Sequence, residues 1–566
     1  MTAMKKWKEK FTVYIQNSLV GKAGRALGRV GAWLLNTSGI FGLLSGEGLS
    51  VSVQNSVVYC AIVGLFEKLR SFSFHFGRKF IQKSVIIQNM QKVHNFLEYG
   101  IQMAKYYAQF SAIWRVFYIG TSVPEYEKPE KTPFPIVGML MLLGLLLLCV
   151  GVLGVLYGCV LFFGFLFLLL LLDRPQIGIY CAVGAAPFLP TMAMAGLLFI
   201  TGACFFLQLL FGNRYHFRMN PTGLFLLVFA LLLLFYGATS YSIQQSLRVA
   251  LLMVLFVGSY FLITSLLLKK QAIRNILFVY CSSALMTGAV GLYQFLSGQI
   301  DVTWTDTELF ENMGRVYSTF DNPNVYGVYL LLVIPVAFAM IFLCQRMVGR
   351  VYYAGTCAVL LVNLGLTYSR GCYLALMVAA LIMIVCVMKK LLLLSIPAVA
   401  ALPFVLPETV IARFSSITNL ADTSTSYRLN IWQGAVRLLG DFWALGIGLG
   451  EAAFQKVYPK YALNAIVAPH AHNLYLQIML EMGIAGLLTF AAAIFCFIHS
   501  CVRAMHKAAF LSKLLIVSIM AGVIGFLFQG IFDYVWYNYR VVLLFFMTLG
   551  IGMSACSLIE RGEELH

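Results

Sequence analysis

From residue 135 to the C-terminal end, long apolar runs alternate with short polar stretches, and most runs approach the length of a membrane-spanning helix. A helix rises about 1.5 Å per residue, so about 20 apolar residues cross the hydrocarbon core of a bilayer. We therefore predict an all-α polytopic membrane protein with about 12 to 14 transmembrane helices, because a helix satisfies its own backbone hydrogen bonds within lipid. The predicted spans are 136–150, 153–172, 176–191, 193–211, 222–239, 246–268, 275–296, 324–344, 350–368, 371–388, 391–405, 474–499, 510–531 and 540–559. The first four are the hardest to separate, and two long helices or broken hairpins remain alternatives there.

Residues 1–133 follow a different pattern and contain no uncharged apolar run of about 20 residues. Instead, one helical face carries Ile86, Met90, Val93, Leu97 and Ile101. Such a stripe is typical either of a helix lying on a membrane surface or of the core of a small cytoplasmic helical domain, and both interpretations stay open. We divide the chain into this basic, amphipathic region, 1–133, and a transmembrane domain, 134–566.

Composition agrees with insertion in a membrane, since 61% of the residues are hydrophobic and only 11% are charged, which excludes a soluble enzyme. The chain has 40 Lys and Arg against 22 Asp and Glu, a net charge of +18, of which residues 1–133 supply +10. In a membrane protein this excess indicates contact with anionic lipids rather than with nucleic acid. The 13 cysteines form no CxxC pair, so neither a disulfide framework nor a zinc site is predicted.

The basic residues in the short loops orient the predicted bundle, because loops rich in Lys and Arg face the cytoplasm. Both termini then lie on the cytoplasmic side. The loops assigned to the cytoplasm are 213–220, 269–274, 345–350, 389–390 and 500–507, and the loops left outside are 240–245, 297–323, 369–370, 406–473 and 532–539. Segment 406–473 is the only large outer loop, and a loop of that size is usually functional or separately folded.

Arginines on the predicted outer side run against the positive-inside bias, and three of them occur in distinctive settings. Arg315 precedes a span, Arg370 lies in a tight turn between two spans, and Arg428 begins an amphipathic helix in the large loop. A guanidinium offers a rigid fork of donors that fits phosphate oxygens and stays charged in a partly desolvated site. Together the three would bind a pyrophosphate, and the alternative is that each anchors in lipid headgroups. The other outward cations, Arg437, Lys456, Lys460 and Arg540, are assigned to anchoring or solvated positions.

His472 lies in the sequence Pro469-His470-Ala471-His472-Asn473, at the predicted outer mouth of a span. A neutral imidazole there can accept a proton from a hydroxyl near neutral pH, as a general base does. The alternatives are a structural histidine, which is the commoner case, and a metal ligand together with His470. A His-x-His pair without carboxylate or thiolate partners nearby completes no metal site, so no metal is predicted.

Aromatic side chains supply candidate glycan contacts. All seven tryptophans fall outside the predicted spans, as expected of an aromatic belt at the membrane interface. The flat faces of Trp432 and Trp443 also suit sugar rings, so these two residues, with Tyr317 and Asn473, are candidate glycan contacts.

Four motifs occur in an order that resembles the O-antigen ligase and O-antigen polymerase superfamily of bacterial membrane glycosyltransferases. They are Phe320-Asp321-Asn322-Pro323-Asn324; Tyr368-Ser369-Arg370-Gly371; Arg428-x-x-x-Trp432 followed by Gly446-Ile447-Gly448-Leu449-Gly450; and His472-Asn473, nine residues, Gly483-x-x-Gly486. The resemblance covers residues 300–500, and the hydropathy pattern extends it over 135–560. Residues 1–133 have no counterpart in this pattern.

The resemblance implies a GT-C type fold that takes a glycan from undecaprenyl pyrophosphate and transfers it to a hydroxyl of a glycan or lipid-linked acceptor, without a metal or another cofactor. It implies His472 as the catalytic base and Arg315, Arg370 and Arg428 as the pyrophosphate-binding residues. The enzyme would be an inverting glycosyltransferase in polysaccharide biosynthesis, active on the outer face of the bacterial inner membrane. Ligases and polymerases share these motifs. The region 1–133 could dock on the membrane or on other polysaccharide assembly proteins.

Two other classes share part of the pattern. A lipid-linked oligosaccharide flippase or another secondary transporter would show repeated halves and ionisable residues at the membrane midplane, whereas here the ionisable residues gather at the predicted outer rim of one half. A peptidoglycan polymerase of the cell-shape and division type would centre on an outward carboxylate, Asp422 or Asp533, rather than on His472.

Overall fold

The computed structural model describes residues 135–566, except 212–214, 301–304, 307–312, 388, 390–391, 393–422, 464–465, 467 and 566. Before residue 135 it describes only 64, 68, 98–100, 102 and 103. The predicted region 1–133 therefore lies almost wholly outside the described residues, as do the predicted span 391–405 and Asp422. The described part is helical apart from two short antiparallel strands, β1 (Thr305–Asp306) and β2 (Met313–Gly314), which confirms the predicted all-α class.

Eleven helices in the described part are long and apolar enough to cross a membrane, which confirms a polytopic membrane protein. They are the Gly154–Asp173 part of α8 (Pro135–Asp173), α10 (Thr191–Phe211), α11 (Pro221–Ala238), α12 (Ile243–Leu266), α13 (Lys270–Ser297), α14 (Pro323–Leu343), α15 (Met347–Leu366), α16 (Arg370–Val387), α21 (Leu474–Lys507), α22 (Phe510–Gln529) and α23 (Tyr539–Glu560). The sequence pattern indicated fourteen runs, and the difference lies mainly in its first four.

The predicted first four spans form one bent helix, one short helix and one full span. Residues 136–150 and 153–172 both belong to α8, which bends at Gly154, where φ is 78°. The predicted span 176–191 is replaced by α9 (Gln176–Ala185), a helix of 10 residues. At about 1.5 Å per residue, α9 covers only half the thickness of a bilayer core. The turn after α9 contains Pro187 and Pro190, which cannot donate backbone hydrogen bonds to prolong it.

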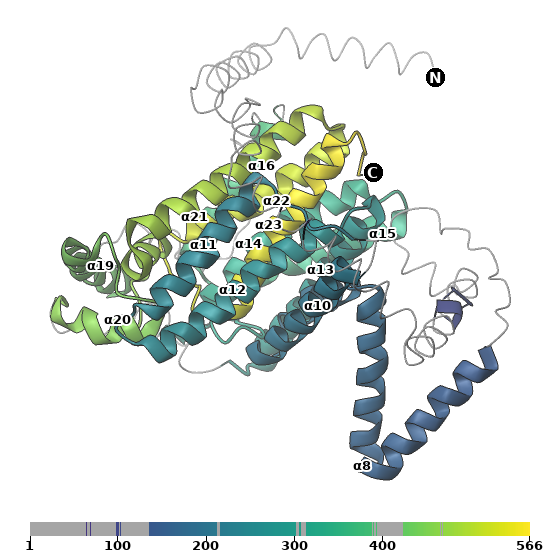
Figure 1. The fold of residues 1–566 in the computed structure, drawn as a ribbon. Coiled ribbons are helices and arrows are strands. Elements are labelled where there is room, and N and C mark those ends of the chain that lie inside the picture. The colour runs from purple at the N-terminus through teal and green to yellow at the C-terminus, as the bar shows by residue number, and fades with distance from the viewer. Residues whose placement is uncertain are drawn as a thin grey trace, which may run out of the picture.

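Three helices form the centre of the bundle. Within its most apolar stretch, α23 is 94% buried, α14 is 83% buried and α22 is 78% buried. By the same measure only 17% of the Gly154–Asp173 segment is buried, and Figure 1 shows α8 projecting from the bundle, which it joins beside α9 and α10. An apolar helix with so little protein around it is suited to contact with lipid.

A small layer of helices covers one end of the bundle, where Figure 1 shows α19 (Thr423–Phe442) and α20 (Glu451–Val457). α20 continues into a 3-10 turn, η4 (Tyr458–Lys460). Ile431, Phe454 and Tyr458 are buried in an apolar cluster of this layer, separate from the main core. These elements belong to the predicted large loop 406–473, so the described part of that loop has a small core of its own.

The layer is attached to the bundle at a break in α21. Gly483 interrupts this helix with a φ of 60°, and a side chain there would overlap the carbonyl oxygen of Ala444. Loop 443–450 runs along the break, and the Ile447 N–H donates to the Leu480 carbonyl at 2.8 Å. The loop thereby satisfies backbone groups that the kink releases. The glycines of two sequence motifs, distant along the chain, meet at this contact.

Candidate active site

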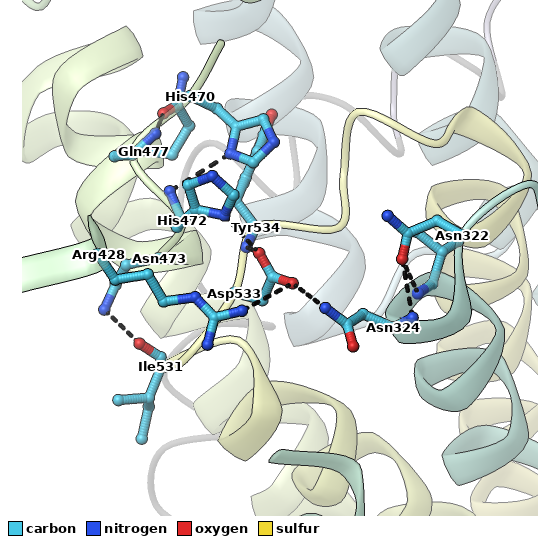
Figure 2. A network of polar contacts seen from close by, with 12 residues as sticks. Asn322, Asn324, Arg428, His470, His472, Asn473, Gln477, Ile531, Asp533 and Tyr534 are labelled. Atoms are coloured by element: carbon cyan, nitrogen blue, oxygen red, sulfur yellow. Dashed lines mark hydrogen bonds and ion pairs between the residues drawn. The ribbon is translucent and has the colours of Figure 1, made fainter. Parts of the chain in front are cut away.

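Side chains from three other segments meet at the carboxylate of Asp533, in the turn between α22 and α23. Figure 2 shows Asp533 between residues from the start of α14, from α19 and from the turn before α21. Its side chain is 8% exposed, and its two oxygens face His472, Asn324 and Arg428. A buried carboxylate is stable only where it is paired and hydrogen-bonded, and these three partners meet that requirement.

Of these three partners His472 is the closest to the carboxylate, with its Nδ1 atom 2.9 Å from Oδ1 of Asp533. The backbone of His472 has a φ of 47°, in the left-handed region that costs a non-glycine residue about 1–2 kcal/mol. Such strain persists where surrounding contacts fix the residue, and it is frequent at functional sites. When Nδ1 donates its hydrogen to Asp533, Nε2 is the ring nitrogen that can accept a proton.

The partners of Asp533 keep its carboxyl group ionised. Burial alone would raise the pKa of this carboxyl, but the hydrogen bond with His472 and the positive charge of Arg428 outweigh burial. The pKa of Asp533 therefore lies below its ordinary value, and the carboxylate is ionised at neutral pH. An ionised aspartate on Nδ1 orients the imidazole and stabilises the imidazolium that forms when Nε2 takes up a proton.

Asn324 connects Asp533 to Arg315. Asn324 Nδ2 donates to Oδ2 of Asp533 at 3.0 Å, and Asn324 Oδ1 accepts from Nη2 of Arg315 at 2.9 Å. Arg315 Nε also donates to the carbonyl oxygen of Thr367, at 2.9 Å. Asn322 caps α14 by accepting the Asn324 N–H at 2.8 Å, which fixes the first turn of the helix. The sequence Asn-Pro-Asn thus supplies a cap, a first helical residue and a ligand of the carboxylate.

The other two predicted arginines belong to elements that lie next to this region. Arg428, on α19, places Nη2 3.9 Å from Oδ2 of Asp533, and its side chain is 27% exposed. Arg370 is the first residue of α16, and a methyl group on its neighbour Gly371 would lie 3.7 Å from Cβ of Phe532, the residue before Asp533. Arg428 is therefore in direct contact with the carboxylate, and the helix of Arg370 begins beside the same turn.

His470 lies next to His472, with the two ring centroids 4.2 Å apart. Its ring stacks on Tyr537 at a centroid distance of 5.1 Å, and its Nδ1 accepts the His472 N–H at 3.3 Å. Burial, followed by repulsion from His472, lowers the pKa of His470 to about 4, so this ring is neutral at pH 7. Among the described residues, no group of three or more His, Cys, Asp or Glu side chains is arranged to hold a metal ion.

The candidate glycan contacts have different environments. Asn473 caps α21 by accepting the Leu476 N–H at 2.9 Å, and its Nδ2 donates to the Ile531 carbonyl at 2.7 Å, so its side chain joins two elements. Trp443 is 54% exposed, whereas Trp432 and Tyr317 are partly buried. Of the four side chains, the indole of Trp443 has the largest free face for a sugar ring.

Sequence reasoning missed the central role of Asp533, which it named only for a rival class of enzyme. The sequence does carry one signal, an acidic residue in a short loop otherwise made of aromatic and small side chains. Arg540 was assigned to anchoring, but its guanidinium contacts the Asp321 carboxylate at 2.6 Å and the Thr319 carbonyl at 2.7 Å. Arg540 therefore fixes the segment that leads into α14.

The fold and the site together define a class, a polytopic membrane protein with a histidine–aspartate pair and arginines gathered at one end of its helical bundle. Residues 355–491 match the family model described as O-antigen ligase. This match supports assignment of the chain to the O-antigen ligase and polymerase family and confirms the family predicted from the motifs. The matched segment contains Arg370, Arg428 and His472 and ends before Asp533. No curated protein matches the chain.

The family match implies a glycosyltransferase-like membrane enzyme that acts on lipid-linked glycans. Together with the apolar helices, it indicates a multi-pass protein of the inner membrane.

Proposed function

We propose that this protein polymerises or ligates a surface polysaccharide, transferring a glycan from undecaprenyl pyrophosphate to a sugar hydroxyl of a glycan or lipid-linked acceptor on the outer face of the membrane. The observation that carries the proposal is the 2.9 Å contact between His472 and the buried, ionised Asp533, with Arg428 on the other oxygen of that carboxylate. A histidine held in this way is suited to act as a general base.

The reaction follows from the roles of these groups. Nε2 of His472 takes the proton of the acceptor hydroxyl, and the hydroxyl oxygen forms a bond to the anomeric carbon of the donor. The bond between that carbon and the pyrophosphate oxygen breaks, and the pyrophosphate leaves with the electron pair. Because attack and departure occur on opposite sides, the configuration at the anomeric carbon inverts.

The arginines stabilise the leaving group in this proposal. Negative charge builds on the bridging oxygen as pyrophosphate leaves, and pre-positioned guanidinium groups stabilise that charge without reorganising. Arg428 is partly exposed beside Asp533, Arg315 is hydrogen-bonded to Asn324, and Arg370 begins the helix that starts beside the turn of Asp533. With the arginines in this role, the reaction needs no metal ion or other cofactor.

The test is transfer by the purified full-length protein in detergent, with an undecaprenyl-pyrophosphate glycan, an acceptor and EDTA. We expect the wild-type protein to form product with inverted configuration, determined by NMR of the new linkage, and His472→Ala to lower kcat by about 100-fold or more. Unchanged transfer by His472→Ala would remove the histidine as base. Loss of wild-type product in EDTA, restored by a divalent cation, would contradict a metal-independent reaction.

Asp533 separates the proposal from a carboxylate-centred mechanism. We expect Asp533→Asn to impair transfer as His472→Ala does, because the amide cannot stabilise an imidazolium. Asp441→Asn is the matched control, since Asp441 lies on the exposed side of α19 and pairs with Tyr461. An inactive Asp533→Asn beside an active His472→Ala would make Asp533 the base and would favour the peptidoglycan-polymerase interpretation.

A further inference from the structure

Two buried polar side chains of α21, Gln477 and Glu481, connect to the backbone directly before His472, and the proposed reaction does not use them. They lie one helical turn apart and are 1% and 5% exposed. Buried polar and ionisable groups in a membrane-spanning helix are costly, and they mark positions where partners and a role retain them.

The contacts of these two side chains form one continuous chain of hydrogen bonds. Gln477 Oε1 accepts the backbone N–H of Ala471 at 2.8 Å, and Gln477 Nε2 donates to Oε1 of Glu481 at 2.9 Å. The same carboxylate oxygen accepts the Gly450 N–H at 3.0 Å. The chain therefore runs from loop 443–450 to the residue directly before His472.

We propose that Gln477 and Glu481 are positioning residues, which hold the strained backbone of His472 in register with loop 443–450. Histidine does not prefer the φ of 47° that His472 adopts, so the turn 470–472 needs several surrounding contacts to fix its backbone in this conformation. The Ala471 hydrogen bond is one such contact. The inference rests on the proposed function, because it assigns both residues an effect on the reaction through His472.

The same chain couples the base to the element that carries Arg428. Arg428 lies on α19, which leads into loop 443–450, and Arg428 also contacts Asp533, the partner of His472. Two routes therefore connect α19 to the histidine, one through the carboxylate and one through Glu481 and Gln477. A shift of α19 would therefore stretch either the contact with Asp533 or the hydrogen bonds through Glu481 and Gln477, and so displace His472. A displacement of about 1 Å at a reacting group can lower a rate about 100-fold.

The test compares kinetics of the purified full-length protein. Gln477→Met keeps the length of the side chain but removes both hydrogen-bonding atoms, whereas Glu481→Gln keeps an oxygen that can accept from Gly450 and from Gln477. We expect Gln477→Met to lower kcat by about 10- to 100-fold with an unchanged donor KM, and Glu481→Gln to retain most of the activity. Thr489→Val, which removes a polar contact to Ala485 on the same helix, is the control and should behave as wild type.

A rise in donor KM at unchanged kcat, or wild-type kinetics for Gln477→Met, would overturn the positioning role. If Gln477→Met does not fold, Glu481→Gln and Glu481→Asp show whether activity depends on the length of the side chain at position 481 or on its charge. Aspartate keeps the charge but is one methylene too short to reach Gly450, so we expect the Gln variant to be active and the Asp variant to be impaired; the reverse order contradicts the proposal. Full activity of His472→Ala would instead show that the proposed function itself fails.

Discussion

Arg428 and Arg370 occupy positions where the shape of the cation matters as much as its charge. A guanidinium can bridge two phosphate oxygens while a further N–H faces a carboxylate, but an ammonium is a point charge that cannot keep this geometry. We expect Arg428→Lys and Arg370→Lys each to lower kcat/KM for the donor by about 10- to 100-fold, because each loses a charge-assisted hydrogen bond.

The control for both is Arg437→Lys, an exposed position on the same helix as Arg428. Transfer assays over a range of donor concentrations give the comparison. Wild-type kinetics in Arg370→Lys would indicate that this arginine anchors α16 in the lipid headgroups instead.

His470 links the site to stability at acidic pH. The fold lowers its pKa from 6.5 to about 4, so between these values the unfolded chain binds a proton that the folded protein excludes. The stabilisation from neutral His470 is therefore complete above pH 6.5 and is lost as pH falls towards 4. We expect the melting temperature of His470→Gln to fall less steeply across this window than that of the wild-type protein. His506→Gln, at an exposed position of α21, should keep the wild-type slope, and equal slopes for all three proteins would contradict this effect.

Individual residue types predicted the site better than pairings did. The three arginines stand out because they put positive charge on the predicted outer side, and His472 stands out because it lies at the predicted mouth of a span. Asp533 lies 61 residues from His472, and nothing local to either residue indicates that they meet. For the same reason Gln477 and Glu481, which look like ordinary helix residues, could not be connected to His472 from the sequence.

At the scale of elements, the kink in α21 explains why the chain carries two glycine motifs, 446–450 and 483–486, which meet in the fold. Gly483 has a positive φ and lies against the backbone of Ala444, so a Cβ atom there is excluded both by conformation and by space. We expect Gly483→Ala to separate loop 443–450 from α21, to lower the melting temperature clearly and to reduce transfer.

Gly258→Ala is the matched control, because Gly258 lies within α12 with ordinary helical geometry and open space around its α-carbon. Alanine is the better helix former there, so thermal stability should be unchanged or slightly higher. Equal melting temperatures for the two alanine variants would show that the kink does not need glycine.

Hydropathy predicted most of the helices, and it failed where the length of a helix decides whether it spans the membrane. The runs 136–150 and 176–191 are apolar, but the first is one limb of α8 and the second contains only the 10 residues of α9. Whether an apolar run crosses a membrane depends on where its helix ends, and here a glycine with positive φ and a pair of prolines set those limits. The large loop showed the opposite problem, because the amphipathic α19 carries too few apolar residues to signal the small core that it builds.

At the scale of the whole molecule, the proposed site requires that the α19 layer face away from the cytoplasm. Gly440 has open space around its α-carbon, so Gly440→Cys introduces a thiol on this layer without a clash. We expect a membrane-impermeant maleimide to label Gly440→Cys in intact spheroplasts. Gln345→Cys, in the loop assigned to the cytoplasm, should react only after the membrane is opened. Labelling in the reverse order would invert the predicted orientation and place the site on the cytoplasmic side.

The burial of α23 also has a consequence for how the protein is made. α23 is the most buried candidate span of the described chain, yet it follows the other ten in sequence. A chain emerging from the ribosome therefore inserts the other ten spans first, and the place of α23 beside α14 and α22 is filled last. Until then α14 and α22 lack their shared neighbour, and the turn that carries Asp533 is tethered at one end only. We therefore expect the contact between His472 and Asp533 to be among the last to form during biogenesis.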